Sequence, residues 1–136
     1  MPALPLDQTI TVSIAALAGL CLLLAIAVTV ARGKYNVLAG SDENPEHLLY
    51  QLIRAHGNQT EFVPILILLM WILGQTAQPA WVLWTVIAVT ASRFLMAAGM
   101  IIPRTLAVPN PARFIGALGT YLGGLALCVA LVMTLN

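Results

Sequence analysis

Charged residues are scarce in this sequence. Only 8% of the 136 residues are charged, whereas soluble domains usually carry about a quarter. Six Lys and Arg against five Asp and Glu leave a formal net charge of +1, which provides no basic field to hold a nucleic-acid backbone. The composition excludes an ordinary soluble domain and nucleic acid as a main partner, and the length leaves room for a single domain, 1–136.

Cysteine chemistry and metal-ligand patterns are also missing. The two cysteines, Cys21 and Cys128, lie deep in separate apolar runs, where a thiol behaves as a small hydrophobic group. His47 and His56 are not at the spacing of metal ligands, and Glu61 has no second acid near it. We therefore expect no disulfide, no cysteine nucleophile and no metal site.

Long apolar runs make up most of the chain. They predict helices at about 8–31, 46–73, 80–102 and 112–135, and a helix needs about 20 apolar residues to cross a bilayer. Asn44-Pro45 and Asn110-Pro111 precede the second and fourth runs, in the pattern of an N-cap followed by proline at the first helical position. The sequence predicts an all-α integral membrane protein, a bundle of four transmembrane helices whose second and third spans form a tight hairpin.

The basic residues beside the spans predict an orientation, because cytoplasmic loops are enriched in Lys and Arg. Arg32 and Lys34 follow the first span, and Arg104 and Arg113 lie between the third and fourth. The N-terminus and the second loop contain neither residue type. We therefore expect loops one and three in the cytoplasm and both termini on the opposite side.

A polar stripe enters the second span. Four polar residues recur at helical spacing, so they share one face of the predicted helix: Gln51, Arg54, Asn58 and Glu61. Charged side chains inside a membrane usually face a bundle interior or water and mark function. Arg93 on the third span lies at a comparable depth, which predicts an ion pair with Glu61. Such a pair can serve helix register alone, but the whole stripe resembles a receptor for a small zwitterion.

Small residues line the fourth span at spacings of three and four, the pattern by which membrane helices approach closely: Gly116, Gly119, Thr120, Gly123 and Gly124. The sequence leaves open whether this contact lies within one bundle or between subunits. Four short helices enclose little volume, which favours a ligand site between protomers of an oligomer.

The sequence resembles the MAPEG family, the membrane-associated proteins of eicosanoid and glutathione metabolism. The resemblance rests on Arg54-Ala55-His56-Gly57-Asn58 with Glu61 and Pro64, and on four further positions: Arg32, Lys34, Arg93 and Gly99. It implies a homotrimer that holds glutathione between subunits near the cytoplasmic face, and the His-Gly-Asn form is similar to the bacterial branch, which implies a bacterial inner membrane. The glutathione-binding residues that the resemblance implies are Arg32, Arg54, His56, Asn58, Glu61 and Arg93, and the polar stripe adds Gln51 to this predicted site.

The resemblance further implies a glutathione transferase or peroxidase that acts on lipophilic substrates. A guanidinium beside the glutathione sulfur would favour the thiolate, and the candidates for that role are Arg32, Arg104 and Arg113. Met96 and Met100 stand where well-studied eukaryotic members have tyrosines, so a non-catalytic lipid-binding protein or accessory subunit of a larger membrane complex is the alternative. A proton or ion conduit through Glu61, Arg93 and His56 ranks below both.

Overall fold

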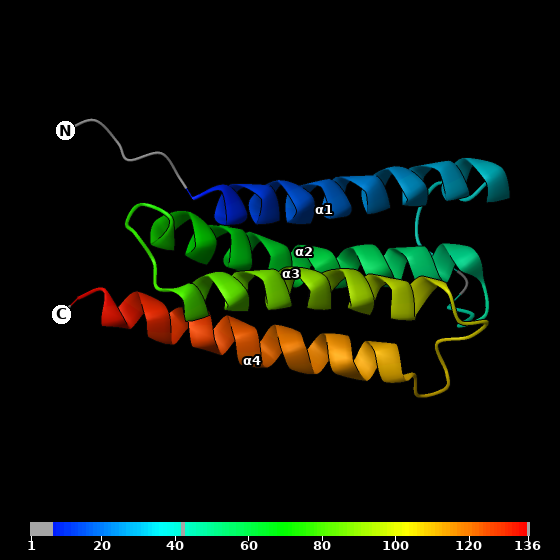
Figure 1. Cartoon of the computed structure of the whole chain (residues 1–136). Helices are drawn as coiled ribbons and strands as arrows, with labels where there is room; N and C mark the ends of the chain where they lie inside the picture. The colour runs from blue at the N-terminus through cyan, green and yellow to red at the C-terminus, as the bar shows by residue number, and fades with distance from the viewer. Residues whose placement is uncertain (1–6, 42, 136) are drawn as a thin grey trace.

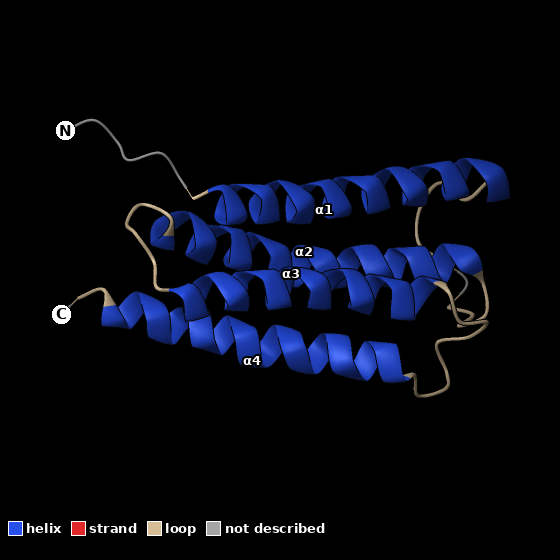
Figure 2. Ribbon diagram, viewed as in Figure 1, coloured by secondary structure: helices blue, strands red, loops and turns tan. Residues whose placement is uncertain are grey.

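Four helices lie side by side in a computed structural model that describes residues 7–41 and 43–135 (Figure 1). They are α1 (Gln8–Tyr35), α2 (Leu48–Leu73), α3 (Ala80–Ile101) and α4 (Pro111–Met133). Consecutive helices run in opposite directions, so the α1–α2 and α3–α4 loops share one end of the bundle, here called the loop end. The described residues form no strand (Figure 2), and the predicted all-α bundle is confirmed.

Local caps explain most of the helix boundaries. The Asn110 side chain accepts hydrogen bonds from the backbone N–H of Ala112 (2.8 Å) and Arg113 (3.3 Å), as an N-cap before proline requires. Asn44 instead forms a local turn, in which its side-chain oxygen accepts from the Glu46 N–H at 3.0 Å. The second helix therefore begins at Leu48, slightly later than the predicted residue 46.

Two apolar clusters fill the bundle, one on each side of a buried polar layer. The cluster nearer the termini includes Leu17, Val63 and Val89, and the cluster nearer the loop end includes Leu24, Ala55 and Ala97. Gln59 and Arg93 fall between these positions on α2 and α3 and are both buried. The core is therefore continuous along the bundle except for one polar layer at its middle.

Three of the four glycines of α4 pack against α3 of the same chain. A Cβ atom on Gly116 would lie 2.7 Å from the Met96 backbone nitrogen, and one on Gly119 or Gly123 would overlap Ser92 or Val89. Gly99 of α3 is equally close to the backbone of Arg113. The question that the sequence left open is thus settled: this small-residue contact lies within the bundle.

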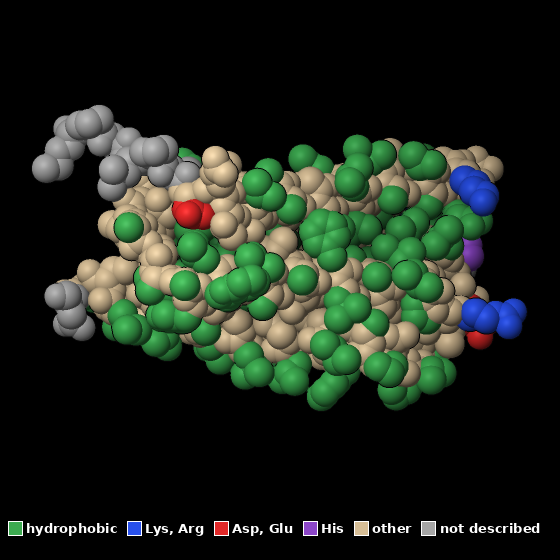
Figure 3. Space-filling model, in the orientation of Figure 1, with side chains coloured by type: hydrophobic (Ala, Val, Ile, Leu, Met, Phe, Trp, Pro, Cys, Tyr) green, Lys and Arg blue, Asp and Glu red, His purple; other side chains and the backbone are tan. Residues whose placement is uncertain are grey.

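Apolar side chains cover most of the face shown in Figure 3, and the Lys and Arg side chains visible there gather at the loop end. Three helices, α1, α3 and α4, are long and apolar enough to cross a membrane. Arg54, His56 and Glu61 lower the mean hydropathy of α2, but this helix lies alongside the other three (Figure 1). Lipid-facing apolar surface and end-located charge are the arrangement expected of a protein in a bilayer.

Candidate functional site

Arg93 is the centre of the buried polar layer, with 1% of its surface exposed. Its Nε donates to Gln59 Oε1 at 3.0 Å, and its Nη2 donates to the Asn58 backbone oxygen at 2.9 Å and to Asn58 Oδ1 at 2.7 Å. Its Nη1 lies 3.5 Å from Thr120 Oγ1. The guanidinium carbon also lies 5.0 Å from the centre of the Phe62 ring, within the range of a cation–π contact. Each of the three nitrogens of a charge that is costly in the bilayer thus has at least one acceptor within 3.5 Å.

The predicted ion pair between Arg93 and Glu61 does not form. Among the described residues Glu61 makes no hydrogen bond or ion pair, and its side chain is exposed. Residues two apart on a helix do not share a face, so Gln59 accepts the hydrogen bond from Arg93 while Glu61 acts on Arg93 only as a nearby charge. Gln59 is thus the partner of Arg93 in place of Glu61, and its Nε2 also donates to the Arg93 carbonyl oxygen at 3.1 Å.

The four residues of the predicted stripe on α2 differ in how far their side chains are exposed. Gln51 is buried, Asn58 is half-buried, and Arg54 and Glu61 are exposed. Neither charged side chain has a hydrogen-bond or ion-pair partner among the residues that the structure describes. An exposed cation and an exposed anion therefore lie on one side of α2, and Arg93 attracts Glu61 only through space, without an ion pair.

Gln51 has a structural task at the loop end. Its Nε2 donates to the carbonyl oxygens of Pro45 (3.2 Å) and Pro103 (3.0 Å), and the Leu106 N–H donates to the same Pro45 oxygen at 2.9 Å. These bonds fasten the α1–α2 loop to the α3–α4 loop. Because its amide nitrogen is engaged and its side chain is buried, we do not include Gln51 among the ligand contacts proposed below.

The other predicted site residues lie on the same side of the polar layer as the loops. His56 is half-buried on α2. Arg32 Nη1 donates to the Gly40 carbonyl oxygen and Arg113 Nη1 to the Leu106 carbonyl oxygen, both at 3.0 Å, whereas Arg104 is exposed. The structure thus brings the basic residues to one end of the bundle, and it ties two of the three candidate arginines to loop backbone.

Two cavities lie along α4, and one of them is lined by Arg113. One of about 630 Å³ is lined by Met96, Arg113, Phe114 and neighbouring loop residues. Another of about 420 Å³ lies between α2 and α4 and is lined almost entirely by apolar side chains, including Phe62 and Tyr121. Both spaces are lined mainly by apolar side chains, and the first also has Asn110 and Arg113 in its lining.

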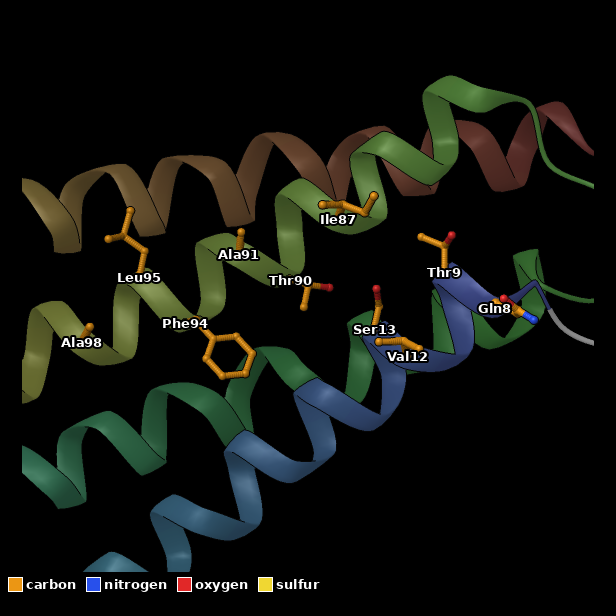
Figure 4. A pocket seen from close by; sticks show the side chains of 10 residues that line it. All are labelled: Gln8, Thr9, Val12, Ser13, Ile87, Thr90, Ala91, Phe94, Leu95 and Ala98. Atoms are coloured by element: carbon orange, nitrogen blue, oxygen red, sulfur yellow. The ribbon is translucent and has the colours of Figure 1, made fainter.

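A third and larger cavity, of about 930 Å³, lies between α1 and α3. Figure 4 shows Phe94 of α3 facing Val12 and Ser13 of α1 across it. None of the predicted site residues lines this cavity, so it does not belong to the candidate site.

Sequence reasoning missed Gln59 and assigned no role beyond packing to Thr120. Gln59 was detectable as a second uncharged polar residue beside Asn58 within a span, because a buried amide in a bilayer needs a partner. Tyr121 was also missed: its ring lies 5.7 Å from the Phe62 ring. Nothing in the sequence indicates that Phe62 and Tyr121 meet, because the rotation of α4 about its axis is not encoded in any motif.

Comparison with known proteins agrees with the geometry. The sequence model of the MAPEG family matches residues 10–133, which is nearly the whole chain and includes the polar layer, the exposed charges and the loop-end arginines. No curated protein and no solved structure matches the chain. The chain therefore belongs to the MAPEG family and is an integral membrane protein of this glutathione and eicosanoid metabolism family.

Proposed function

We propose that the protein binds glutathione at the loop end of the bundle, on the cytoplasmic side of the membrane. The observation that carries the proposal is the exposed pair on α2, Arg54 and Glu61, neither of which has a hydrogen-bond or ion-pair partner among the described residues. Charged groups left open inside a span are costly unless something pairs with them. A peptide with carboxylates for a guanidinium and an ammonium for a carboxylate satisfies both.

The spacing of the two charges suits a tripeptide. Arg54 and Glu61 are seven residues apart, or about 10.5 Å along the axis at 1.5 Å per residue, and three extended residues span about 10 Å. Both side chains are exposed on one chain, so a second copy that covers this side of α2 would enclose the ligand. We therefore include a homotrimer of the family type in the proposal, in a bacterial inner membrane.

Arg113 is the best placed of the three arginines to stabilise a thiolate. It lines the cavity of about 630 Å³ together with Met96, and it is half-buried, which strengthens its interaction with an anion. Arg104 is more exposed to screening, and Arg32 lies on the far side of α2 from α4 in the bundle. Beside Arg113 the glutathione sulfur would lose its proton more readily and attack a lipophilic electrophile from the bilayer.

Glutathione binding is expected to weaken at least tenfold in Glu61→Gln, because a charge-assisted hydrogen bond contributes about 1.5–3 kcal/mol and about 1.4 kcal/mol is a tenfold change in Kd. Equilibrium binding of radiolabelled glutathione to the detergent-solubilised protein measures the change. Glu43→Gln removes an exposed carboxylate from loop one and is the matched control. Equal retention by wild type and Glu61→Gln, or no retention by wild type, would contradict the proposal.

Measuring glutathione conjugation and peroxide reduction distinguishes an enzyme from the alternative, a non-catalytic lipid-binding or accessory protein. The apolar cavity of about 420 Å³ between α2 and α4 favours a lipophilic second ligand in either case. For an enzyme, Arg113→Met is expected to lower conjugation of glutathione to a lipophilic aryl halide about tenfold, since one lost cation raises the thiol pKa by about one unit. Arg113→Lys keeps a cation and is the control. Glutathione binding by wild type without conjugation or peroxide reduction would favour the alternative.

A further inference from the structure

Asn58 stands between the buried and the exposed polar groups. It is half-buried, it lies one helical turn from both Arg54 and Glu61 on the same side of α2, and its side-chain oxygen accepts from Arg93 Nη2 at 2.7 Å. One polar atom of the Asn58 amide therefore points inward to the guanidinium, and the other points in a different direction.

The chemistry of arginine decides which atom faces inward. A guanidinium has five N–H donors and no acceptor, so the Asn58 atom 2.7 Å from Arg93 Nη2 must be the oxygen. The Asn58 Nδ2 group has no hydrogen-bond partner among the described residues, and it is not one of the buried polar atoms without a partner. The NH2 group of Asn58 therefore reaches the surface between Arg54 and Glu61.

The opposite orientation is excluded as long as Arg93 stays in place. A rotated amide would set two N–H donors against each other and leave a buried donor unsatisfied, which is costly. Arg93 in turn is held by Gln59 in both directions, through Arg93 Nε to Gln59 Oε1 at 3.0 Å and Gln59 Nε2 to the Arg93 carbonyl oxygen at 3.1 Å. A chain of three residues, each oriented by the one before it, therefore ends at the exposed amide.

We propose that Arg93, held by Gln59, is a positioning residue that fixes Asn58 as a hydrogen-bond donor toward the ligand. This inference rests on the proposed function. The exposed side of α2 then presents a donor at Arg54, a donor at Asn58 and an acceptor at Glu61. The ligand atom opposite Asn58 is consequently a carboxylate or carbonyl oxygen, and a ligand with an N–H group there is rejected.

Asn58→Asp tests the donor directly. Aspartate keeps an oxygen for Arg93 and converts the outward NH2 group into a second oxygen, so the buried layer keeps its bonds while the ligand loses its donor. The glutathione Kd is expected to rise at least tenfold, and the midpoint of thermal unfolding in detergent is expected not to fall. A fall in the midpoint together with unchanged binding would overturn the inference.

The positioning role has its own readout in the side-chain NH2 signals of Asn58. In an NMR spectrum of protein labelled with 15N-asparagine, the side-chain NH2 signals that disappear in the Asn58→Asp variant are assigned to Asn58. These signals are expected to shift when glutathione binds. Arg93→Lys keeps the charge but lacks the planar guanidinium that orients Asn58. Adding Asn58→Asp to the Arg93→Lys variant is therefore expected to raise the glutathione Kd less than threefold.

Failure of this inference is distinguishable from failure of the proposed function. Loss of binding in Glu61→Gln, with unchanged binding in Asn58→Asp or unmoved Asn58 signals, would overturn the positioning role alone. No binding by wild type would overturn both. An equal loss from Asn58→Asp in the wild-type and Arg93→Lys backgrounds would show that Arg93 does not orient the amide.

Discussion

Gln59→Leu is expected to destabilise the bundle by about 3 kcal/mol, the lower end of the range for removing one partner of a buried charge. Leucine fills a similar volume, so the effect comes from lost hydrogen bonds. Arg93 Nε would lose its acceptor, and the Arg93 carbonyl oxygen would lose the Gln59 donor that it has in addition to its bond within α3. Arg93 is buried away from water. The free energy of unfolding, measured by denaturant titration in mixed micelles, reports the change.

Gln59→Glu is the matched control for that prediction. It keeps the acceptor and adds a negative charge beside the guanidinium, so its free energy of unfolding is expected to stay within about 1 kcal/mol of wild type, since it gives up only the bond to the Arg93 carbonyl oxygen. If the leucine variant were as stable as wild type, the polar layer would contribute nothing to stability. The role of Gln59 would then be limited to orienting Arg93.

Gly116→Val is expected to cost about 3 kcal/mol, the upper end of the usual range for overpacking. A Cβ atom at this position would lie 2.7 Å from the Met96 backbone nitrogen and 2.9 Å from its Cα. A backbone cannot rotate away as a flexible side chain can, so α3 and α4 would have to separate. Thermal unfolding of the purified protein in detergent measures the loss.

Gly19→Ala provides a control of opposite sign for the glycine contact. Gly19 lies within α1, and nothing lies within 4 Å of the Cβ that would be added there. Alanine has the higher helix propensity, so this variant is expected to be as stable as wild type or about 0.5–1 kcal/mol more stable. If Gly19→Ala and Gly116→Val lowered the stability of the protein equally, separation of α3 and α4 would not be the cause of the loss.

The helices were predictable from the sequence because their signals are local. Apolar runs set their number, and Asn110-Pro111 sets the start of α4 through bonds between adjacent residues. Boundaries shifted where backbone hydrogen bonding continues beyond the apolar run. The first helix, for example, extends past residue 31 to Tyr35, where Asn36 in the left-handed conformation ends it.

The partners within the site were not predictable in the same way. Opposite charge at similar depth led to the prediction of an Arg93–Glu61 pair, but the choice between Glu61 and Gln59 depends on how α2 is rotated toward α3. Spacing in one chain gives the face of a helix and not its neighbour. The glycines of α4 illustrate the same limit, since their pattern indicated a close contact without saying that α3 supplies it.

The two-way bond between Gln59 and Arg93 has a consequence for biogenesis. Arg93 would enter the bilayer on α3 at a cost of about 2.5–3.5 kcal/mol if it were alone, and all the backbone and amide oxygens that surround it come from α2. The two helices are joined only by the short turn at 74–79. We therefore expect the translocon to release α2 and α3 together as a helical hairpin, in which the earlier helix shields the later one during insertion.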